Sequence, residues 1–155
     1  MDMKQLQDKL ARLGEVDASS MVGDDFLLTW EKSDAELEAT FLTADILRGL
    51  REANVSSRLF DSGLAISLFR DNSTRTRFSF ASACNLLGLE VQDLDEGKSQ
   101  IAHGETVRET ANMISFMADV IGIRDDLYIG KGNAYMREVS RAVAAGHRDG
   151  VLEQR

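Results

Sequence analysis

Residues 64–77 read Leu-Ala-Ile-Ser-Leu-Phe-Arg-Asp-Asn-Ser-Thr-Arg-Thr-Arg, an apolar run followed by hydroxyl and guanidinium side chains. A short apolar run such as 64–69 is typical of a buried strand, and helical spacing follows over 78–87. The first turn of a helix leaves backbone N–H groups without partners, and its dipole favours negative charge. Hydroxyls and guanidiniums add donors that match phosphate oxygens. The stretch therefore predicts a phosphate site where a strand gives way to a helix; the alternative is a well-capped helix with surface arginines.

Strands and helices alternate along the rest of the chain. We expect strands at 64–69, 89–94 and 120–123, and helices at 74–87, 105–118 and 133–145, the first ending at Gly88 and the last at Gly146. The strands are apolar on both faces, which is typical of a parallel sheet covered by helices. The predicted fold is α/β, a three-layer αβα arrangement with a central parallel sheet.

The N-terminal part is predicted to be helical. Residues 1–13 are amphipathic and of mixed charge, which indicates a surface helix, and Ser33 and Glu36 have capping-box spacing before helical apolar positions over 37–50. We expect residues 1–24 to form an N-terminal extension and residues 25–155 to form the main domain.

The predicted sheet brings three polar elements to one edge. Residues 70–77 follow the first strand, the polar segment 95–104 reads as a loop after the second, and Arg124 ends the third. Ligands of parallel α/β sheets bind at the carboxyl ends of the strands. Three donor-rich elements are therefore expected to converge there.

Composition narrows the function classes. Eighteen Lys and Arg residues against 26 Asp and Glu residues give a net charge of −8, which argues against nucleic-acid binding. One cysteine, Cys84, allows no internal disulfide and fits a reducing compartment, where we expect it to be buried. No membrane-spanning run or signal peptide is evident, so a cytoplasmic location is expected. Neither common glycine-rich nucleotide-binding motif occurs, which disfavours a nucleotide-binding domain.

Three blocks of sequence, in order and spacing, resemble the aspartate/ornithine carbamoyltransferase family. They are Phe-Arg-Asp-Asn-Ser-Thr-Arg-Thr-Arg-Phe-Ser-Phe at 69–80, Ser-Gln-Ile-Ala-His-Gly-Glu-Thr at 99–106, and Asp-Val-Ile-Gly-Ile-Arg at 119–124. The resemblance covers about residues 25–155, and the text around 95–100 and 132–138 is most similar to the YgeW-like branch. It implies that this domain is the carbamoyl-phosphate half of a two-domain transcarbamylase, a transferase of amino-acid metabolism.

The resemblance also implies roles for individual residues. The phosphate of carbamoyl phosphate would be held by Ser73, Thr74, Arg75 and Thr76, with Arg75 also near the bridging oxygen. Arg124 would reach the carbamoyl carbonyl oxygen, although an ordinary ion pair with a neighbouring aspartate is its alternative. The family chemistry requires no metal and no organic cofactor. The partners would be carbamoyl phosphate and an amino-acid acceptor, with no nucleic acid or membrane involved.

Further implications concern neighbouring subunits. Gln100 and His103 would enter the site of an adjacent subunit in a homotrimer, whereas an ordinary solvated loop is the alternative for both residues. Arg77 would support the loop rather than touch the ligand.

The family pattern continues with a His-Pro-x-Gln segment and an amino-acid-binding domain that this sequence does not contain. We therefore expect a truncated enzyme whose isolated domain is inactive and whose acceptor is not specified. A non-catalytic anion-binding or oligomerisation module on the same scaffold is the alternative function.

Some apolar side chains have no place in that site. Met113, Phe116 and Met117 share a helical face and are expected in the core. Trp30 and Tyr135 are also expected to pack.

Overall fold

The computed structural model describes residues 2–70, 73–99, 103–126 and 128–148. The chain divides into two compact units, Met1–Ser57 and Arg58–Arg155. No helix in the part of the chain that the structure describes is long and apolar enough to cross a membrane.

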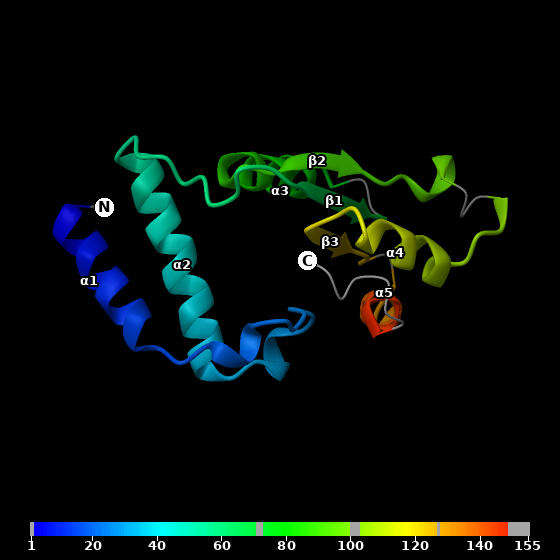
Figure 1. Cartoon of the computed structure of the whole chain (residues 1–155), viewed down its shortest axis with the longest axis horizontal. Helices are drawn as coiled ribbons and strands as arrows, with labels where there is room; N and C mark the ends of the chain where they lie inside the picture. The colour runs from blue at the N-terminus through cyan, green and yellow to red at the C-terminus, as the bar shows by residue number, and fades with distance from the viewer. Residues whose placement is uncertain (1, 71–72, 100–102, 127, 149–155) are drawn as a thin grey trace. The chain divides into compact units, whose positions relative to one another are not determined.

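The first unit is helical. It contains α1 (Met3–Glu15) and α2 (Asp34–Glu52), joined by a segment with two short 3-10 turns, η1 (Ser19–Met21) and η2 (Thr29–Glu31) (Figure 1). Ion pairs link the two long helices: Lys9 lies 2.8 Å from Asp45, and Arg12 lies 2.7 Å from Glu38. Capping boxes at Asp2 and Ser33 start the two helices, so both predicted helices are confirmed.

The second unit contains a parallel sheet. Its described strands are β1 (Leu64–Phe69), β2 (Glu90–Asp93) and β3 (Val120–Arg124), in the order β2-β1-β3. In the register, Ser67 lies opposite Asp93, and Phe69 lies opposite Arg124. Strand β1 is central, and this position explains its apolar sequence and the burial of Ala65 to Phe69.

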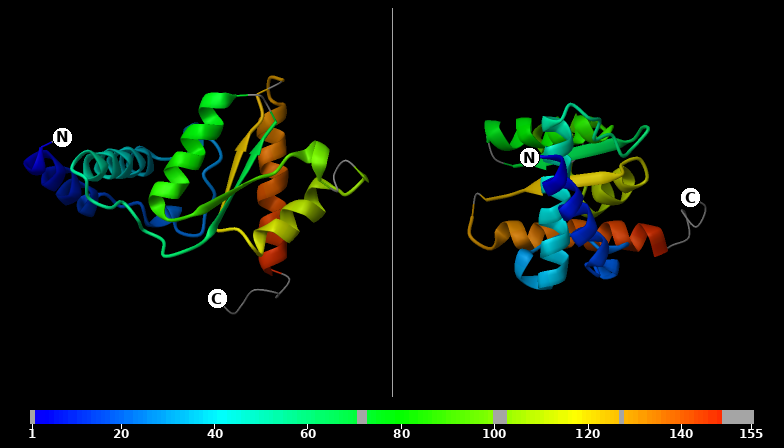
Figure 2. Two further views of the ribbon diagram at one scale, coloured as in Figure 1. Left: turned by 90° about the horizontal axis from the view of Figure 1, so that it is seen from above. Right: turned by 90° about the vertical axis from the view of Figure 1, so that its left-hand side faces the viewer.

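Helices cover both faces of this sheet, as Figure 2 shows. Helix α3 (Thr74–Leu87) packs on one face, where Cys84 contacts Ala65 and Leu89. Helices α4 (Val107–Ser115) and α5 (Lys131–Arg148) pack on the other face, around Leu68 and Val139. The predicted three-layer α/β fold is therefore confirmed.

Glycine ends α3 as predicted. Gly88 has a φ of 103°, in the left-handed region that glycine adopts without strain. A Cβ at this position would lie 2.0 Å from the carbonyl oxygen of Phe60, so a larger residue would clash with backbone.

Two helix boundaries differ from the prediction. Helix α4 begins after Thr106, because the Thr106 side chain accepts the backbone N–H of Glu109 and so defines the cap. Helix α5 begins at Lys131 and continues through Gly146, where we expected it to end. An interior glycine costs a helix only about 1 kcal/mol, so it weakens a helix without having to end it.

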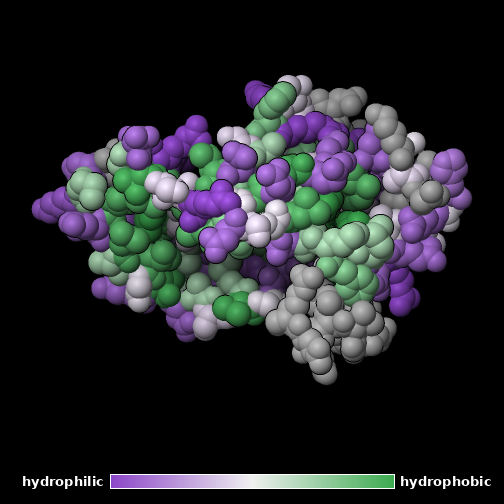
Figure 3. Space-filling view, turned by 45° about the horizontal axis from the view of Figure 1, so that its top comes forward, coloured by the Kyte–Doolittle hydropathy of each residue, from purple (hydrophilic) through white to green (hydrophobic). Residues whose placement is uncertain are grey.

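The packing predictions have mixed outcomes. Cys84 and Tyr135 are buried, as expected. Met113 and Met117 are 45% and 56% exposed, so their assignment to the core was wrong. Trp30 was expected to pack and is 73% exposed. Hydrophobic side chains reach the surface among hydrophilic ones on the face drawn in Figure 3.

Candidate functional site

The carboxyl edge of the sheet brings together the elements that the sequence placed there. Strand β1 ends at Phe69, beside Arg124 at the end of β3, and the backbone N–H of Arg70 donates to the Arg124 carbonyl at 2.9 Å. Helix α3 begins at Thr74, and the short turn η3 (Glu96–Lys98) follows the end of β2. The predicted convergence is therefore present.

The start of α3 differs from the starts of the other capped helices. Helices α1, α2 and α4 begin with capping boxes, in which the cap side chain accepts a backbone N–H of the first turn. Ser73 at the start of α3 makes no such bond, and the first turn of α3 contains no acidic residue. Its hydroxyl oxygen instead lies 3.0 Å from that of Thr76. This helix is therefore not well capped by its own side chain, contrary to the alternative considered for this stretch.

Arg124 reaches the first turn of α3 from the end of β3. Its Nη1 donates to the hydroxyl oxygen of Thr76, and its Nη2 donates to Asp126 Oδ2 at 2.7 Å. The ion pair considered as an alternative is thus present, and its partner is Asp126. The same guanidinium also faces the hydroxyl pair, so the ion pair does not remove Arg124 from the site.

Two arginines on α3 have different environments. Arg75 is exposed on the first turn, as is Thr74. Arg77 donates to Asp93 at 2.6 Å and to the Phe69 carbonyl at 2.7 Å, and so joins α3 to the ends of β2 and β1. These contacts agree with the expectation that Arg77 supports the loop.

Of the two residues predicted to act on a neighbouring subunit, the structure describes only His103. Gln100 lies outside the described residues. His103 is exposed, and within the described ranges it makes no hydrogen bond or ion pair with Ser73, Thr76 or Arg124.

Sequence reasoning missed a charged network at the same edge. Arg70 donates Nε and Nη2 to the two carboxylate oxygens of Glu96, at 2.9 and 3.0 Å, and Nη1 to Asp125 Oδ2 at 3.0 Å. Its guanidinium carbon lies 3.7 Å from the centre of the Tyr135 ring, and the Tyr135 hydroxyl donates to Glu96 at 2.7 Å. The only sequence signal was a basic residue directly after a strand, with acidic residues in the loops after the other two strands.

Burial and charge set the protonation of this network. Burial raises the pKa of Tyr135, and the hydrogen bond to Glu96 raises it further. Burial acts to lower the pKa of Arg70, but its hydrogen bonds to Glu96 and Asp125 outweigh that effect and raise it. The network therefore holds a protonated tyrosine and a charged guanidinium at neutral pH.

A hollow of about 760 Å³ lies beside this network. It does not include Ser73, Thr76 or Arg124. Four carboxylates line it and would repel a dianion, so the hydroxyl–guanidinium cluster at α3 is the better phosphate site. The lining residues are Leu68, Phe69, Arg70, Arg77, Asp93, Leu94, Asp95, Glu96, Gly97, Asp125, Tyr128 and Lys131.

The described residues contain no cluster of three or more His, Cys, Asp or Glu side chains placed to hold a metal ion. The arrangement at α3 is instead one of hydrogen-bond donors and positive charge, which suits an oxyanion.

Residues 24–147 match the family model described as "Aspartate/ornithine carbamoyltransferase, carbamoyl-P binding domain". The chain belongs to the aspartate/ornithine carbamoyltransferase family. The family resemblance predicted from the three sequence blocks is thereby confirmed, and the matched domain is the carbamoyl-phosphate-binding one.

Individual relatives of this carbamoyltransferase domain belong to the same family. It is 69% identical over 131 residues to "Putative carbamoyltransferase YgeW" of Escherichia coli K12, a match that covers 84% of this chain and 33% of the relative. Ornithine carbamoyltransferase from Pyrococcus furiosus has a TM-score of 0.68 at 25% identity, over 77% of this chain and 37% of that one.

A third comparison supports the fold alone. Aspartate transcarbamoylase from Trypanosoma cruzi, solved in complex with carbamoyl phosphate, has a TM-score of 0.67 at 23% identity, over 77% of this chain and 36% of that one. The domain thus spans about a third of the length of the curated relatives it matches.

Proposed function

We propose that this chain binds carbamoyl phosphate at the start of α3, as part of an enzyme that transfers the carbamoyl group to an amino-acid amine. The observation that carries the proposal is the junction of Ser73, Thr76 and Arg124, where α3 begins without a side-chain cap. Family membership supplies the substrate class.

Each side chain has a role that follows from its donor groups. Ser73, Thr74, Arg75 and Thr76 hold the phosphate through hydroxyls, the Arg75 guanidinium and backbone N–H groups. Arg75 also approaches the bridging oxygen. Arg124 comes from the end of the neighbouring strand β3 and donates to the carbamoyl carbonyl oxygen.

This arrangement suits carbamoyl transfer. An amine attacks the carbamoyl carbon, and negative charge develops on the carbonyl oxygen. Phosphate then leaves with the electrons of the C–O bond that breaks, and the proton lost by the amine ends on the phosphate. Donors aimed at both oxygens stabilise this state more than the ground state. Holding both substrates in place lowers the barrier further.

Other parts of the proposal concern the whole enzyme. Gln100 and His103 would complete the site of an adjacent subunit in a homotrimer, a prediction that sedimentation velocity can test. The chain spans about a third of its relatives' length. We therefore propose that this chain alone binds carbamoyl phosphate without transferring its carbamoyl group.

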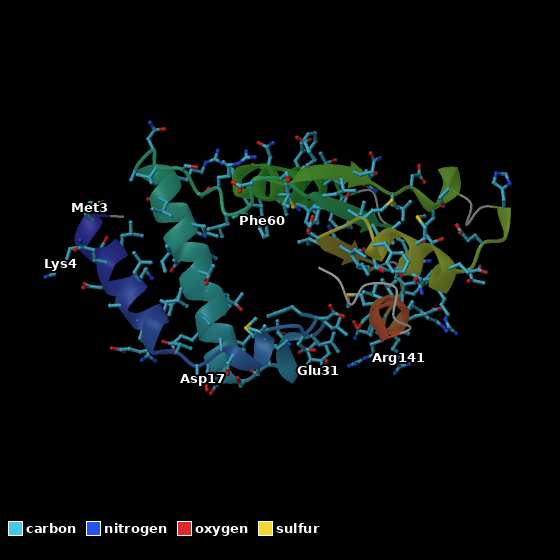
Figure 4. All side chains as sticks on the ribbon, in the orientation of Figure 1. Met3, Lys4, Asp17, Glu31, Phe60 and Arg141 are labelled. Atoms are coloured by element: carbon cyan, nitrogen blue, oxygen red, sulfur yellow. The ribbon has the colours of Figure 1, made fainter. Side chains whose placement is uncertain are left out.

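Titration calorimetry with phosphate and with carbamoyl phosphate tests the site. Replacing Arg75 with alanine removes charge-assisted hydrogen bonds worth about 1.5–3 kcal/mol each, so affinity should fall roughly ten- to hundredfold. Arg141→Ala is the matched control, because Arg141 is an exposed arginine on α5 (Figure 4). Equal anion binding by wild type and Arg75→Ala would show that the assignment is wrong.

A further inference from the structure

Arg70 directly follows β1, and its side chain contacts three other elements of the second unit. Each of its three nitrogen atoms donates to a carboxylate: Nε and Nη2 to Glu96 of η3, and Nη1 to Asp125 after β3. The guanidinium also lies over the ring of Tyr135 on α5. With all three nitrogens engaged, Arg70 is a poor candidate for binding substrate.

Arg70 restrains the residues at the end of β3 through one backbone contact and one side-chain contact. The backbone N–H of Arg70 donates to the carbonyl of Arg124 at 2.9 Å. Its side chain holds Asp125, whose own side chain is only 4% exposed. The backbone on which Arg124 sits is therefore fixed by Arg70 on both sides of the Arg124–Asp125 peptide bond.

We propose that Arg70 is a positioning residue, which fixes the end of β3 so that the Arg124 guanidinium stays at the first turn of α3. The inference rests on the proposed function, because it concerns the arginine assigned to the carbamoyl oxygen. Arg70 acts through Arg124 and does not touch the substrate itself.

The rest of the network holds the Arg70 guanidinium in a single orientation. Glu96 accepts both parallel donors of the fork and also the hydroxyl of Tyr135, at 2.7 Å. Tyr135 is buried and presents its ring face to the guanidinium. A planar fork that is both stacked and bidentate cannot be replaced by an ammonium group, since lysine is a point charge on a flexible stem.

A competing explanation is that Arg70 contributes only positive charge to the anion site. The two explanations differ for Arg70→Lys, which keeps the charge and loses the fork. If charge alone matters, Arg70→Lys binds anions like wild type. If positioning matters, Arg70→Lys is impaired.

The experiment measures carbamoyl phosphate binding by calorimetry with the full chain, together with amide hydrogen exchange of residues 124–126 and 96–99. We expect Arg70→Lys to bind carbamoyl phosphate roughly ten- to hundredfold more weakly, the loss expected when the charge-assisted hydrogen bond from Arg124 is misplaced. We also expect faster exchange in both segments, with the core of β1 still protected.

Lys131→Met is the matched control for charge. Lys131 is exposed, lines the same hollow as Arg70 and lies outside the network. Its replacement should change carbamoyl phosphate affinity by less than about fivefold, as is typical of surface charges. Wild-type carbamoyl phosphate binding by Arg70→Lys, or an equal loss in Lys131→Met, would overturn the positioning role.

Two further measurements keep the inference testable. If Arg70→Lys does not fold, the same two measurements on Tyr135→Phe test the positioning role. This variant keeps the stacked ring and removes only the hydrogen bond to Glu96. Weaker carbamoyl phosphate binding with faster exchange at 96–99 in that variant supports the inference, and wild-type behaviour in both measurements refutes it. If wild type itself does not bind carbamoyl phosphate, the proposed function fails. Exchange at 124–126 in the folded Arg70 variant then decides whether Arg70 fixes the end of β3.

Discussion

The hydroxyl oxygens of Ser73 and Thr76 lie 3.0 Å apart at the start of α3. Thr76 also accepts a hydrogen bond from Arg124, which has donors only. The Thr76 hydroxyl proton is therefore available to Ser73, and the Ser73 proton can then point outward to a ligand. In this arrangement the Ser73 hydroxyl can donate a hydrogen bond to a bound anion.

Replacing Thr76 with valine tests that arrangement with little change of shape. Valine removes the acceptor for Arg124 and the partner of Ser73. We expect a loss of about 1 kcal/mol in phosphate binding, roughly fivefold in affinity, measured by titration calorimetry. Ser79→Ala on the same helix is the control, because the Ser79 hydroxyl donates to the backbone carbonyl of Thr76 and is exposed. Unchanged affinity in Thr76→Val would contradict the arrangement.

Arg77 is expected to matter for stability. Arg77→Met keeps the apolar stem but leaves the Phe69 carbonyl without its guanidinium donor, at the end of the central strand. We expect the free energy of unfolding to fall by about 1–3 kcal/mol in urea denaturation. The Arg77–Asp93 ion pair is 35% and 48% exposed and is worth less.

Asp93→Asn separates these two contributions. It weakens the ion pair but keeps an oxygen that accepts from Ser67, so it should cost less than Arg77→Met. An equal cost for both variants would mean that the ion pair, and not the Phe69 carbonyl, dominates.

Local sequence pattern was enough to predict the strand and the helix on either side of residues 70–73. The strand, the donor-rich turn and the helix are consecutive in the chain. Because they are also adjacent in space, their sequence alone indicates which side chains lie together. The network of Arg70 could not be predicted in this way. Its carboxylates are 26 and 55 residues away, and many exposed acidic residues were equally plausible partners.

Helical periodicity also does not show which face of a helix is buried by its neighbours. The spacing correctly placed Met113 on α4, whereas Met117 lies just after the end of that helix. Both methionines are about half exposed, although Ala111 and Ile114 of α4 are buried. Periodicity identifies residues that share a face, but the packing of α5 on α4 decides which face is covered.

The capping box of α2 gives a prediction for pH. Glu36 accepts the backbone N–H of Ser33 at 2.6 Å and its hydroxyl at 2.8 Å, and these bonds, the backbone one first, lower its pKa below the ordinary 4.5. A lowered folded-state pKa stabilises the native state above the unfolded value. That stabilisation is lost as the pH falls from about 4.5 through the folded pKa.

Glu36→Gln should therefore be less stable than wild type at neutral pH, and the difference should shrink as the pH falls below 4.5. Chemical denaturation at a series of pH values measures this difference. A constant gap between the two proteins across the series would show that Glu36 does not contribute through its charge.

The last prediction concerns the packing of α3 on β3. A Cβ at Gly122 would lie 2.4 Å from Cε2 and 2.8 Å from Cζ of Phe80. The Phe80 ring is also held edge-on against Phe69, with centroids 5.5 Å apart, so it has little room to move. Gly122→Ala should therefore lower the free energy of unfolding by about 1–3 kcal/mol through overpacking.

Phe80→Leu provides the internal control, because a shorter side chain makes room for the added methyl group. The double variant should lose less stability than the sum of the two single variants, with a coupling of about 0.5–3 kcal/mol by urea denaturation. Additive losses would show that the Gly122 clash is relieved elsewhere. Since Gly122 lies on the same strand as Arg124, the same cycle repeated with phosphate titration shows whether this packing also supports the anion site.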